Sequence, residues 1–527
     1  MVSRSDGVVA VGAGLLRGVS EGDLWVFRGV PYASSPGGAG RLRRPRPPTS
    51  WIGVRDALSW GPIAPQPPAM PGLSIPNDPS ASDEDCLSLN IWTPGLDDRR
   101  RPVLVWVHGG GFTTGSGSSA IYRGDRLARR GDAVVVTLNY RLGALGFLAH
   151  PALGDESGMR CGNWGVFDQV AALEWVHEHV GAFGGDPQNV TVFGESAGAM
   201  SIALLLSSSV CGRLFHRAVV QSGPPATAST EWGARRAERL AELAGVEPAR
   251  GLVRESLERL ETQELVRATQ DLANEVSSDA GLPLPLLPVV DGELITQPPA
   301  EAISEGAAAR VPFLIGTTRD EAALFMELDP AAQDLDIGGV VRRVRRIATK
   351  DSAQTLVEAY RDAREARDEP ATPRALLTAI TTDYVFRLPS LALATASYKY
   401  QPGTFAYLFT WESPFLGGIF GSPHGLEIPF VFGTVENEVI GRFSGSGPRA
   451  FELSGGMQEA WLAFAHTGDP SCDALGDWPA YDPLRRPTMV LGPGGGIEDD
   501  PRSPERLAWD EAGIEIAGGF HHEVQHA

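Results

Sequence analysis

Short apolar runs recur along the chain at intervals that predict a layered α/β structure. Residues 102–107 read PVLVWV, 133–138 read AVVVTL and 189–193 read NVTVF, and all three runs are rich in β-branched residues. Runs of this length and composition are typical of strands that are buried on both faces. Further strands are expected at 217–221, 312–316 and 404–410.

Helical patterns fall between these strands. Residues 197–206, AGAMSIALLL, are long and apolar enough for a buried helix, and residues 166–180 show an amphipathic period. Strands that alternate with helices predict a mostly parallel sheet covered on both faces. Residues 232–275 and 340–365 are helical and polar, so we expect them to be excursions built onto that sheet. In 340–347, VVRRVRRI, the apolar positions share one helix face, and the four arginines are expected to form a solvated face.

The length and the net charge of the chain limit the domain arrangements and the classes of partner that it can have. No Pro/Ser-rich linker or block of like charge divides the 527 residues, so one large α/β domain with insertions fits as well as several small ones. The formal net charge of −20 argues against nucleic acids and anionic membrane surfaces, because both require basic patches. No apolar run reaches the length of about 18 residues that would span a bilayer. Between Asp6 and Arg17 the pattern favours a structural β-hairpin over a secretory signal.

Ser196 is the candidate nucleophile, because it lies between two glycines in the stretch TVFGESAGAM. The pattern G-x-S-x-G is weak by itself in a chain with 62 glycines. Its context is more informative, since Ser196 stands between a predicted strand and a predicted helix, as a nucleophile elbow requires. The helix would begin near Ala197 and direct its free N–H groups and positive dipole end at Ser196.

A serine hydroxyl needs a base that accepts its proton and a site that receives the developing negative charge. The histidines downstream of Ser196 are His216, His424, His466, His521, His522 and His526. His424 is the favoured base because a loop of Gly, Ser and Pro presents it after a strand, and we expect it to titrate near pH 6–7. His466 ends an apolar helix, which it is expected to cap. For the acid, Asp320 and Glu321 both follow the strand at 312–316, and spacing does not decide between them.

The stretch HGGGF (108–112) is the candidate for the oxyanion site. It comes directly after the strand at 102–107, and its three glycines can turn their amides toward one oxygen with no Cβ in the way. A tight glycine turn is the simpler alternative. The position of HGGGF, at a strand end expected to face Ser196, favours the functional interpretation.

Nine stretches together resemble the type-B carboxylesterase/lipase family, which includes bacterial para-nitrobenzyl esterases and the cholinesterases. They are FRGVPYA (27–33), EDCLSLNIWTP (84–94), VWVHGGGF (105–112), NYRLGALGFL (139–148), GNWGVFDQ (162–169), FGGDPQNVTVFGESAG (183–198), VVDGELI (289–295), VPFLIGTTRDEAALF (311–325) and HGLEIPFVFG (424–433). They span nearly the whole chain in the family's order. The resemblance implies an α/β-hydrolase fold, with a single domain over 1–527 and helical excursions near 225–285 and 326–400.

The resemblance also assigns roles to individual residues. The implied catalytic triad is Ser196 as nucleophile, Glu321 rather than Asp320 as acid, and His424 as base. The implied oxyanion donors are the amides of Gly110, Gly111 and Ala197. Glu195 and Ser222 match positions near the triad, with a purely structural role as the alternative for each, and Leu324 and Phe325 stand where the family lines its substrate pocket. The resemblance implies no metal and no organic cofactor.

Three departures from the family pattern refine these expectations. Ala322 follows the acid where the family usually has glycine, which is a small change. Secreted relatives join the cysteine that matches Cys86 to an upstream cysteine, whereas Ala64 stands in the matching stretch here. We therefore expect Cys86 to be a free buried thiol and the chain to be cytoplasmic. Residues 61–85 contain no Trp, and Leu324 replaces a frequent aromatic, so choline esters lose two faces that could bind their cation.

The four cysteines are consistent with this view. They are widely scattered and form no C-x-x-C pair, which excludes both a disulfide framework and a zinc site of familiar spacing. They are Cys86, Cys161, Cys211 and Cys472.

The sequence thus predicts a serine carboxylesterase that hydrolyses neutral short-to-medium acyl esters through an acyl-enzyme intermediate. Carbamates, activated amides and thioesters are alternatives that use the same mechanism. A non-catalytic scaffold of the same fold is the alternative from another class, and the presence of all three triad residues argues against it. The expected partner is a small-molecule ester, with neither nucleic acid nor membrane, and the oligomeric state stays open.

Overall fold

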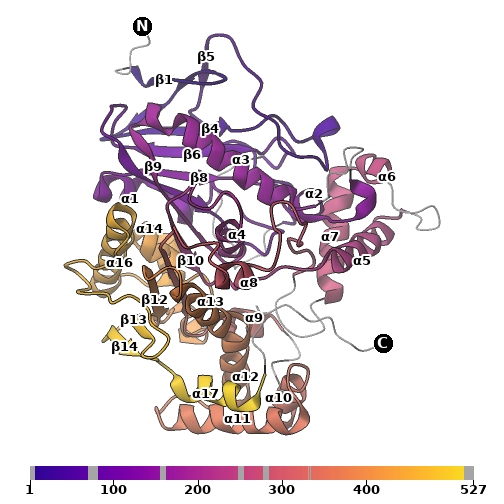
Figure 1. Cartoon of the computed structure of the whole chain (residues 1–527), viewed down its shortest axis with the longest axis vertical. Helices are drawn as coiled ribbons and strands as arrows, with labels where there is room; N and C mark the ends of the chain where they lie inside the picture. Colours follow the sequence, from indigo (N-terminus) through magenta and orange to yellow (C-terminus); the bar gives the residue numbers. More distant parts are fainter. Residues whose placement is uncertain are drawn as a thin grey trace.

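The structure is a computed structural model that describes residues 6–68, 81–154, 162–246, 254–276, 284–329, 332 and 334–514 (Figure 1). Its strands are β1 (Val8–Val11), β2 (Gly14–Arg17), β3 (Val19–Glu21), β4 (Leu24–Pro31), β5 (Val54–Asp56), β6 (Ser88–Thr93), β7 (Arg101–Val107), β8 (Val134–Leu138), β9 (Gly185–Glu195), β10 (Arg217–Gln221), β11 (Phe313–Thr318), β12 (Thr404–Phe409), β13 (Pro487–Leu491) and β14 (Gly496–Asp499).

The α-helices are α1 (Asp125–Gly131), α2 (Gly143–Phe147), α3 (Trp164–His179), α4 (Ala197–Leu206), α5 (Thr230–Leu243), α6 (Arg254–Glu258), α7 (Thr262–Val276), α8 (Pro299–Ser304), α9 (Ala323–Leu328), α10 (Ile337–Val344), α11 (Lys350–Glu365), α12 (Pro373–Thr382), α13 (Leu388–Tyr398), α14 (Ile428–Phe432), α15 (Glu438–Ser444), α16 (Pro448–Thr467) and α17 (Ser503–Ala512). The 3-10 helices are η2 (Gly38–Gly40), η3 (Ala120–Tyr122), η4 (Pro151–Leu153), η5 (Val180–Phe183), η9 (Phe415–Gly418) and η10 (Thr434–Glu436), and η8 (Asp383–Arg387) is a π-helix.

One large mixed sheet organises the described residues. Its eleven strands follow the order β14-β13-β12-β11-β10-β9-β7-β8-β6-β4-β3. The seven strands from β13 to β8 are parallel, and antiparallel pairs flank them on both sides. The six runs predicted as strands are the central elements β7 to β12, and every residue of β7, β8, β11 and β12 is buried. The prediction of a mostly parallel sheet is therefore confirmed.

Helices cover both faces of this sheet, because alternate residues of each central strand point to opposite sides. On β7, Val103, Val105 and Val107 belong to one apolar cluster, which includes residues of α3 and α4. Leu104 and Trp106 belong to a second cluster, with residues of α1, α14 and α16. Helix α4 begins and ends where the sequence predicted.

Helix α3 differs from the prediction of an amphipathic helix over 166–180. Its first ten residues are buried on nearly all sides, and among its side chains only Glu174 and Glu178 are exposed. The charged residue Asp168 is buried as well, where it accepts hydrogen bonds from Arg141 at 2.7 Å. Pairing with a residue from another segment thus allows an acidic side chain of this helix to lie inside the protein.

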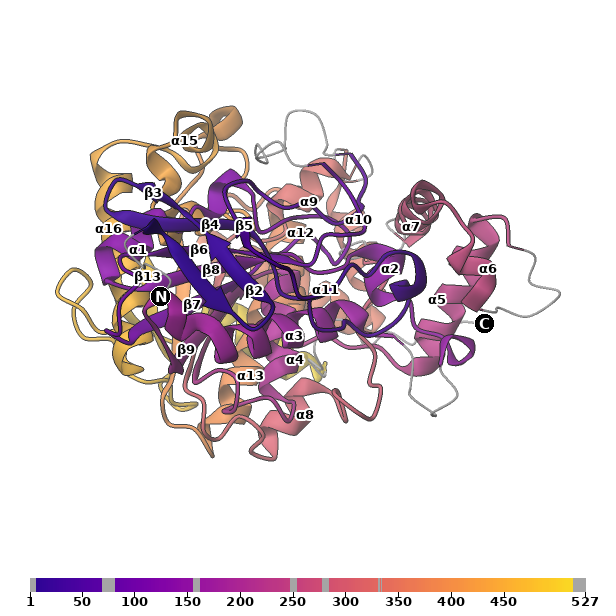
Figure 2. The same cartoon turned by 90° about the horizontal axis from the view of Figure 1, so that it is seen from above.

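Two groups of helices lie away from the sheet. Helices α5, α6 and α7 lie together in both views, and α10, α11, α12 and α17 gather at one end of the molecule in Figure 1 (Figures 1 and 2). The second group has an apolar cluster of its own, which includes Val340, Val341 and Val344. Arg342 on α10 is exposed and Arg343 pairs with Asp329 at 2.6 Å, so the arginines form a largely solvated face as expected. The assignment of residues 1–527 to a single domain stays a prediction.

At the amino terminus β1 and β2 pair antiparallel, so the predicted hairpin is present. Cys86, Cys211 and Cys472 are free thiols, Cys86 being fully buried, whereas Cys161 lies outside the described residues. No helix in the described ranges combines the length and apolar character needed to cross a membrane. Nor do the described histidines, cysteines and acids bring three side chains together in a group that could hold a metal ion.

Candidate active site

Ser196 occupies the sharp turn between β9 and α4. Its backbone has φ 54° and ψ −126°, a conformation that a residue with a side chain rarely adopts and that costs energy unless the surroundings enforce it. The Ser196 N–H donates to the carbonyl of Gln221 at 2.9 Å, which ties the turn to the end of β10. This is the geometry of a nucleophile elbow, which lifts the hydroxyl above the carboxyl ends of the strands.

The two glycines that flank Ser196 are required by the close approach of β7. A Cβ at Gly194 would lie 2.6 Å from the carbonyl oxygen of Val107, and one at Gly198 would lie 2.0 Å from the same atom. Any side chain at either position would push the elbow away from the end of β7. The G-x-S-x-G pattern therefore has a packing reason here beyond its resemblance to a motif.

Glu321 and His424 come from the ends of two different segments and meet directly. His424 Nδ1 lies 2.6 Å from Glu321 Oε2, and the other oxygen of Glu321 accepts a hydrogen bond from the Thr318 N–H at 2.8 Å. The Glu321 side chain is fully buried. Because both carboxylate oxygens are engaged, the acid holds the imidazole in one orientation.

Asp320, the competing acid, points elsewhere. Its carboxylate pairs with Arg319 at 2.8 Å and accepts the Ser422 N–H at 2.9 Å. Asp320 thus supports the loop that carries His424 without touching the imidazole.

The far nitrogen of His424 faces Glu195 and not Ser196. His424 Nε2 lies 3.1 Å from Glu195 Oε1, and among the described residues no hydrogen bond joins the Ser196 hydroxyl to His424. Catalytic hydrogen bonds are often long or poorly aligned before a substrate binds. Glu195 is therefore a direct neighbour of the candidate base and occupies the position at Nε2 from which Ser196 would donate its proton.

Carboxylates set the pKa values at this site. Burial would lower the pKa of His424, but the negative charges of Glu195 and Glu321 outweigh it and raise the pKa to about 9. Burial raises the pKa of Glu195 to about 7, against the opposing effect of His424. The expectation that His424 titrates near 6–7 was wrong, because the sequence did not show how many acids would surround it.

Glu427 is a third buried acid that sequence reasoning missed. Burial raises its pKa to about 8, and the charges of Glu195 and Glu321 add to that effect. One oxygen of Glu427 accepts from Gln221 Nε2 at 3.4 Å, and the other is buried without a hydrogen-bond partner. The sequence feature that could have identified Glu427 is its position three residues after His424, in the stretch HGLEIPF.

The HGGGF stretch forms a loop beside the elbow. A Cβ at Gly109 would lie 3.0 Å from Ser196 Cβ and 2.8 Å from Glu195 Oε2, so the loop lies against both residues. Gly110 and Gly111 have φ of 109° and 61°, and no described residue accepts a hydrogen bond from either amide. The amide of Ala197, the first residue of α4, likewise has no partner within the helix.

His108, the first residue of this loop, is held in place by Tyr140. Its ring stacks on Tyr140 with centroids 4.4 Å apart, and the Tyr140 hydroxyl donates to the His108 carbonyl at 2.8 Å. Burial lowers the pKa of His108 to about 4, so the ring is neutral at physiological pH.

Aromatic rings form a wall next to the imidazole. The ring centroids of Phe325 and Phe386 lie 5.5 and 4.9 Å from that of His424, and the two Phe rings are nearly parallel. Leu324 is half-buried on the same helix as Phe325. Sequence reasoning singled out Leu324 and Phe325 but missed Phe386, for which the sequence carries no local signal.

The remaining candidates lie near the elbow or away from the site. Ser222 follows β10 with φ 53°, its N–H donates to the Gly316 carbonyl at 2.8 Å, and its hydroxyl is buried without a partner. His216 Nδ1 accepts the Val190 N–H at 3.2 Å, and His466 Nε2 lies 2.9 Å from the Gly131 carbonyl. His466 therefore contacts the last residue of α1 and does not cap its own helix. His521, His522 and His526 lie outside the described residues.

The sheet, the strand-to-helix elbow and the site at the carboxyl ends of the strands define an α/β-hydrolase fold. The model of the Carboxylesterase family matches residues 5–506, and the chain belongs to this family. It is 36% identical to the para-nitrobenzyl esterase of Bacillus subtilis over 95% of this chain and 97% of that protein. It is 38% identical to the phenmedipham hydrolase of Pseudarthrobacter oxydans over 94% and 97% of the two chains. The crystal structure of the Geobacillus stearothermophilus carboxylesterase EST55 at pH 6.2 superimposes with a TM-score of 0.84, at 39% identity, covering 95% of this chain and 100% of that one.

Proposed function

We propose that this carboxylic ester hydrolase works as a serine esterase, with Ser196, His424 and Glu321 as its triad. The observation that carries the proposal is the 2.6 Å contact between His424 Nδ1 and Glu321. The other nitrogen of the same ring lies 3.1 Å from Glu195, the residue next to Ser196. A histidine held in this way through Nδ1 can use Nε2 as the base once that nitrogen leaves Glu195, while the acid stabilises the imidazolium that forms.

In the first half of the reaction, the Ser196 hydroxyl oxygen attacks the acyl carbonyl carbon and gives its proton to His424 Nε2. The oxyanion that forms on the substrate is bound by the amides of Gly110, Gly111 and Ala197. Losing one such donor typically costs roughly 3 kcal/mol of barrier. The tetrahedral intermediate then breaks the bond to the alcohol oxygen, and His424 returns its proton to the leaving alcohol.

Water repeats the sequence on the acyl-enzyme. His424 takes a proton from the water as its oxygen attacks the acyl carbon, and it then gives the proton to Ser196 as the acid leaves. Each step requires the imidazole to exchange its contact with Glu195 for one with Ser196 or with water. We infer that Glu195 makes His424 a stronger base but holds it in its protonated form at neutral pH.

The proposed substrates are neutral esters with short-to-medium acyl chains. The apolar rings of Phe325 and Phe386 beside His424 support this choice, since they offer no charged partner to a substrate. Carbamates, activated amides and thioesters are alternative substrates for the same mechanism. They stay candidates because one relative of the chain is a phenmedipham hydrolase. We further propose a cytoplasmic location and a small-molecule partner, with no part for nucleic acid or membrane.

The test is a hydrolysis panel on the purified chain together with its Ser196→Ala variant. The panel contains nitrophenyl acetate to hexanoate, matched carbamates, amides and thioesters, and phenmedipham. Ser196→Ala should lower turnover on the order of a million-fold, as in the best-studied hydrolase triad. Ser207→Ala, a serine at the other end of α4, is the matched control and should keep full activity. A Ser196→Ala variant with a tenth of wild-type activity, or an organophosphate adduct on another serine, would contradict the proposal.

A further inference from the structure

A π-helical turn connects the active site to the carboxyl-terminal helix. The turn η8 (Asp383–Arg387) interrupts a helical segment that runs from α12 into α13, and the Leu388 N–H donates to the Asp383 carbonyl five residues earlier. Pro389 explains the wide turn, because its ring would clash with the carbonyl of Val385 in a regular α-helix. Single π-turns of this kind occur frequently at functional sites.

One side of this turn forms part of the active-site wall. The Phe386 ring is buried and its centroid lies 4.9 Å from that of His424. Thr382, just before the turn, accepts through Oγ1 the N–H of Ala322 at 3.1 Å, and Ala322 follows Glu321. The turn thus contacts the base directly and the acid through its neighbour.

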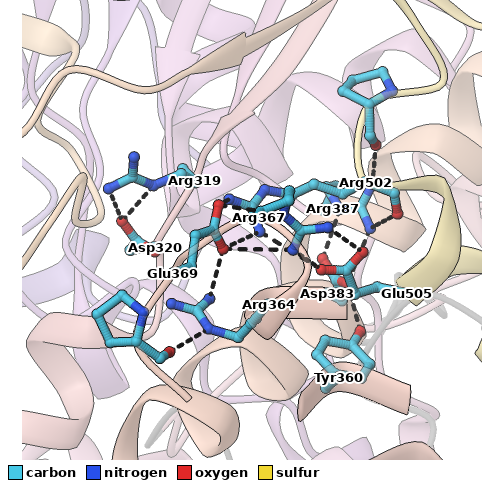
Figure 3. Close-up of polar contacts among 12 residues, drawn as sticks. Arg319, Asp320, Tyr360, Arg364, Arg367, Glu369, Asp383, Arg387, Arg502 and Glu505 are labelled. Carbon is cyan, nitrogen blue, oxygen red and sulfur yellow. Dashed lines mark hydrogen bonds and ion pairs between the residues drawn. The ribbon is translucent and has the colours of Figure 1, made fainter. Parts of the chain in front are cut away.

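The other side of the turn is held by buried charges (Figure 3). Arg387 donates to both oxygens of Asp383, at 2.6 and 2.9 Å. Arg387 also donates to the Pro501 carbonyl at 3.0 Å, in the segment that leads into α17. Asp383 accepts the Tyr360 hydroxyl, which in turn accepts the Trp509 indole N–H at 2.6 Å. The turn is therefore attached both to the segment before α17 and, through Tyr360, to α17 itself.

Helix α17 is itself fixed by a second set of ion pairs. Arg367 of the connection after α11 donates to Glu505, whose side chain is fully buried. Arg502 donates to Glu369 at 2.7 Å, as Figure 3 shows. Movement of α17 relative to the connection after α11 would break these ion pairs, so they hold in place the segment to which the turn is attached.

We propose that Arg387 is a positioning residue for acyl-chain selectivity: by joining the π-turn to the segment before α17, it holds the Phe386 ring against His424 and limits the length of acyl chain that the site accepts. The inference rests on the proposed esterase function and extends it. Neither Arg387 nor α17 touches the substrate, and their effect is transmitted through the position of one ring.

The experiment measures kcat/KM for nitrophenyl acetate and nitrophenyl hexanoate, and reports the hexanoate-to-acetate ratio for each variant. Phe386→Ala should raise the ratio roughly tenfold, because it opens space worth about one methylene or more. Arg387→Met should raise it by about threefold, and in the Phe386→Ala background Arg387→Met should leave it unchanged, since the ring that it positions is gone. Arg361→Met, on an exposed part of α11, is the matched control and should not move the ratio.

Two further variants keep the test informative if Arg387→Met folds poorly. The double change Asp383→Leu with Arg387→Met removes both charges, which avoids an unpaired buried carboxylate. Tyr360→Phe leaves the Asp383–Arg387 pair in place and removes one attachment to α17. The first should reproduce the threefold shift, and the second should shift the ratio in the same direction by about twofold.

The inference would be overturned if the hexanoate-to-acetate ratio were unchanged in all Arg387, Asp383 and Tyr360 variants of an enzyme that still hydrolyses esters. It would also be overturned if Arg387→Met raised the ratio in the Phe386→Ala background as much as it does in the wild type. A wild-type chain that hydrolyses no ester and is not labelled at Ser196 by an organophosphate would instead overturn the proposed function, and with it this inference.

Discussion

Buried charge is arranged in opposite ways around His424 and around Asp383. Three buried acids, Glu195, Glu321 and Glu427, act on the single imidazole of His424. Around Asp383, by contrast, Arg387 donates to both carboxylate oxygens, and the neighbouring acids have arginine partners of their own.

The difference shows in the pKa values. Burial raises the pKa of Glu195 to about 7, and the unbalanced acids raise that of His424 to about 9 against the effect of burial, which places both groups where a proton can move near physiological pH. In the balanced network, burial would lower the pKa of Arg387, but the charge of Asp383 raises it, so that Arg387 keeps its positive charge. Excess charge of one sign is thus a mark of proton chemistry, and matched charge is a mark of structural support.

The largest expected effect is on kcat, and it distinguishes His424, the candidate base, from His466, which also contacts a polar group. His424→Gln should lower kcat on the order of a million-fold, as loss of a triad histidine does elsewhere. His466→Gln should keep most of the activity, because His466 contacts only the end of α1. Steady-state kinetics on both variants checks this, and the reverse pattern would place the base elsewhere.

The next effect separates two adjacent acids. Glu321→Gln should lower kcat about ten-thousand-fold, since an amide favours the wrong imidazole tautomer and offers no charge to the imidazolium. Asp320→Asn should cost much less, because Asp320 pairs with Arg319 and touches only the backbone of Ser422. If Asp320→Asn were the more damaging change in kcat, the contact between Glu321 and His424 would not be the catalytic one.

Stability should respond in opposite directions in the two regions. Asp383→Asn leaves the Arg387 charge buried without its partner and should cost about 3–5 kcal/mol of unfolding free energy. Glu427→Gln should cost little or stabilise, since a carboxyl whose folded pKa is raised destabilises the fold once it ionises. The wild-type chain should therefore lose stability relative to Glu427→Gln as pH rises from the ordinary carboxyl pKa to about 8.

Denaturant titrations of the two variants at several pH values measure these differences. A Glu427→Gln variant as unstable as Asp383→Asn would show that Glu427 is a matched structural charge after all.

The smallest effect is a shift in pH dependence. Because His424 acts as a base only when neutral, kcat/KM of the wild type should rise with pH through a group near 9. Glu195→Gln removes one of the three carboxylates that raise this pKa, so the rise should move to lower pH by about one unit or more. Ser222→Ala, which removes a hydroxyl and no charge, should leave the midpoint in place. A midpoint that does not move in Glu195→Gln would mean that Glu195 does not act on the base.

The central sheet was predictable because strands buried on both faces leave a local signal. All six predicted strands are present, and the boundaries of β10 and α4 agree with the expected residues. The elbow was predictable for a related reason, since it needs glycines at fixed positions around Ser196. The strands β3, β4, β6, β13 and β14, which flank the six central strands of the sheet, were not predicted.

Contacts between segments that are distant in the sequence could not be predicted from it. The resemblance chose Glu321 over Asp320, but the sequence could not show that Glu195 would face His424 or that Glu427 would be buried nearby. Helix α3 was misread because Asp168 is compensated by Arg141, a residue 27 positions earlier.

The sequence by itself determined the central strands β7 to β12 and the elbow at Ser196, because each depends on residues that are neighbours along the chain, and its resemblance to the family supplied the triad candidates. Only the tertiary structure decided the charge around His424, the ring of Phe386 beside it and the support that α17 gives to the π-turn. These features depend on burial and on pairs of side chains that are far apart in the sequence, as between Glu195 and His424 or between Tyr360 and Trp509. Local patterns record which face of an element is apolar, but they do not record which buried charge will meet its partner.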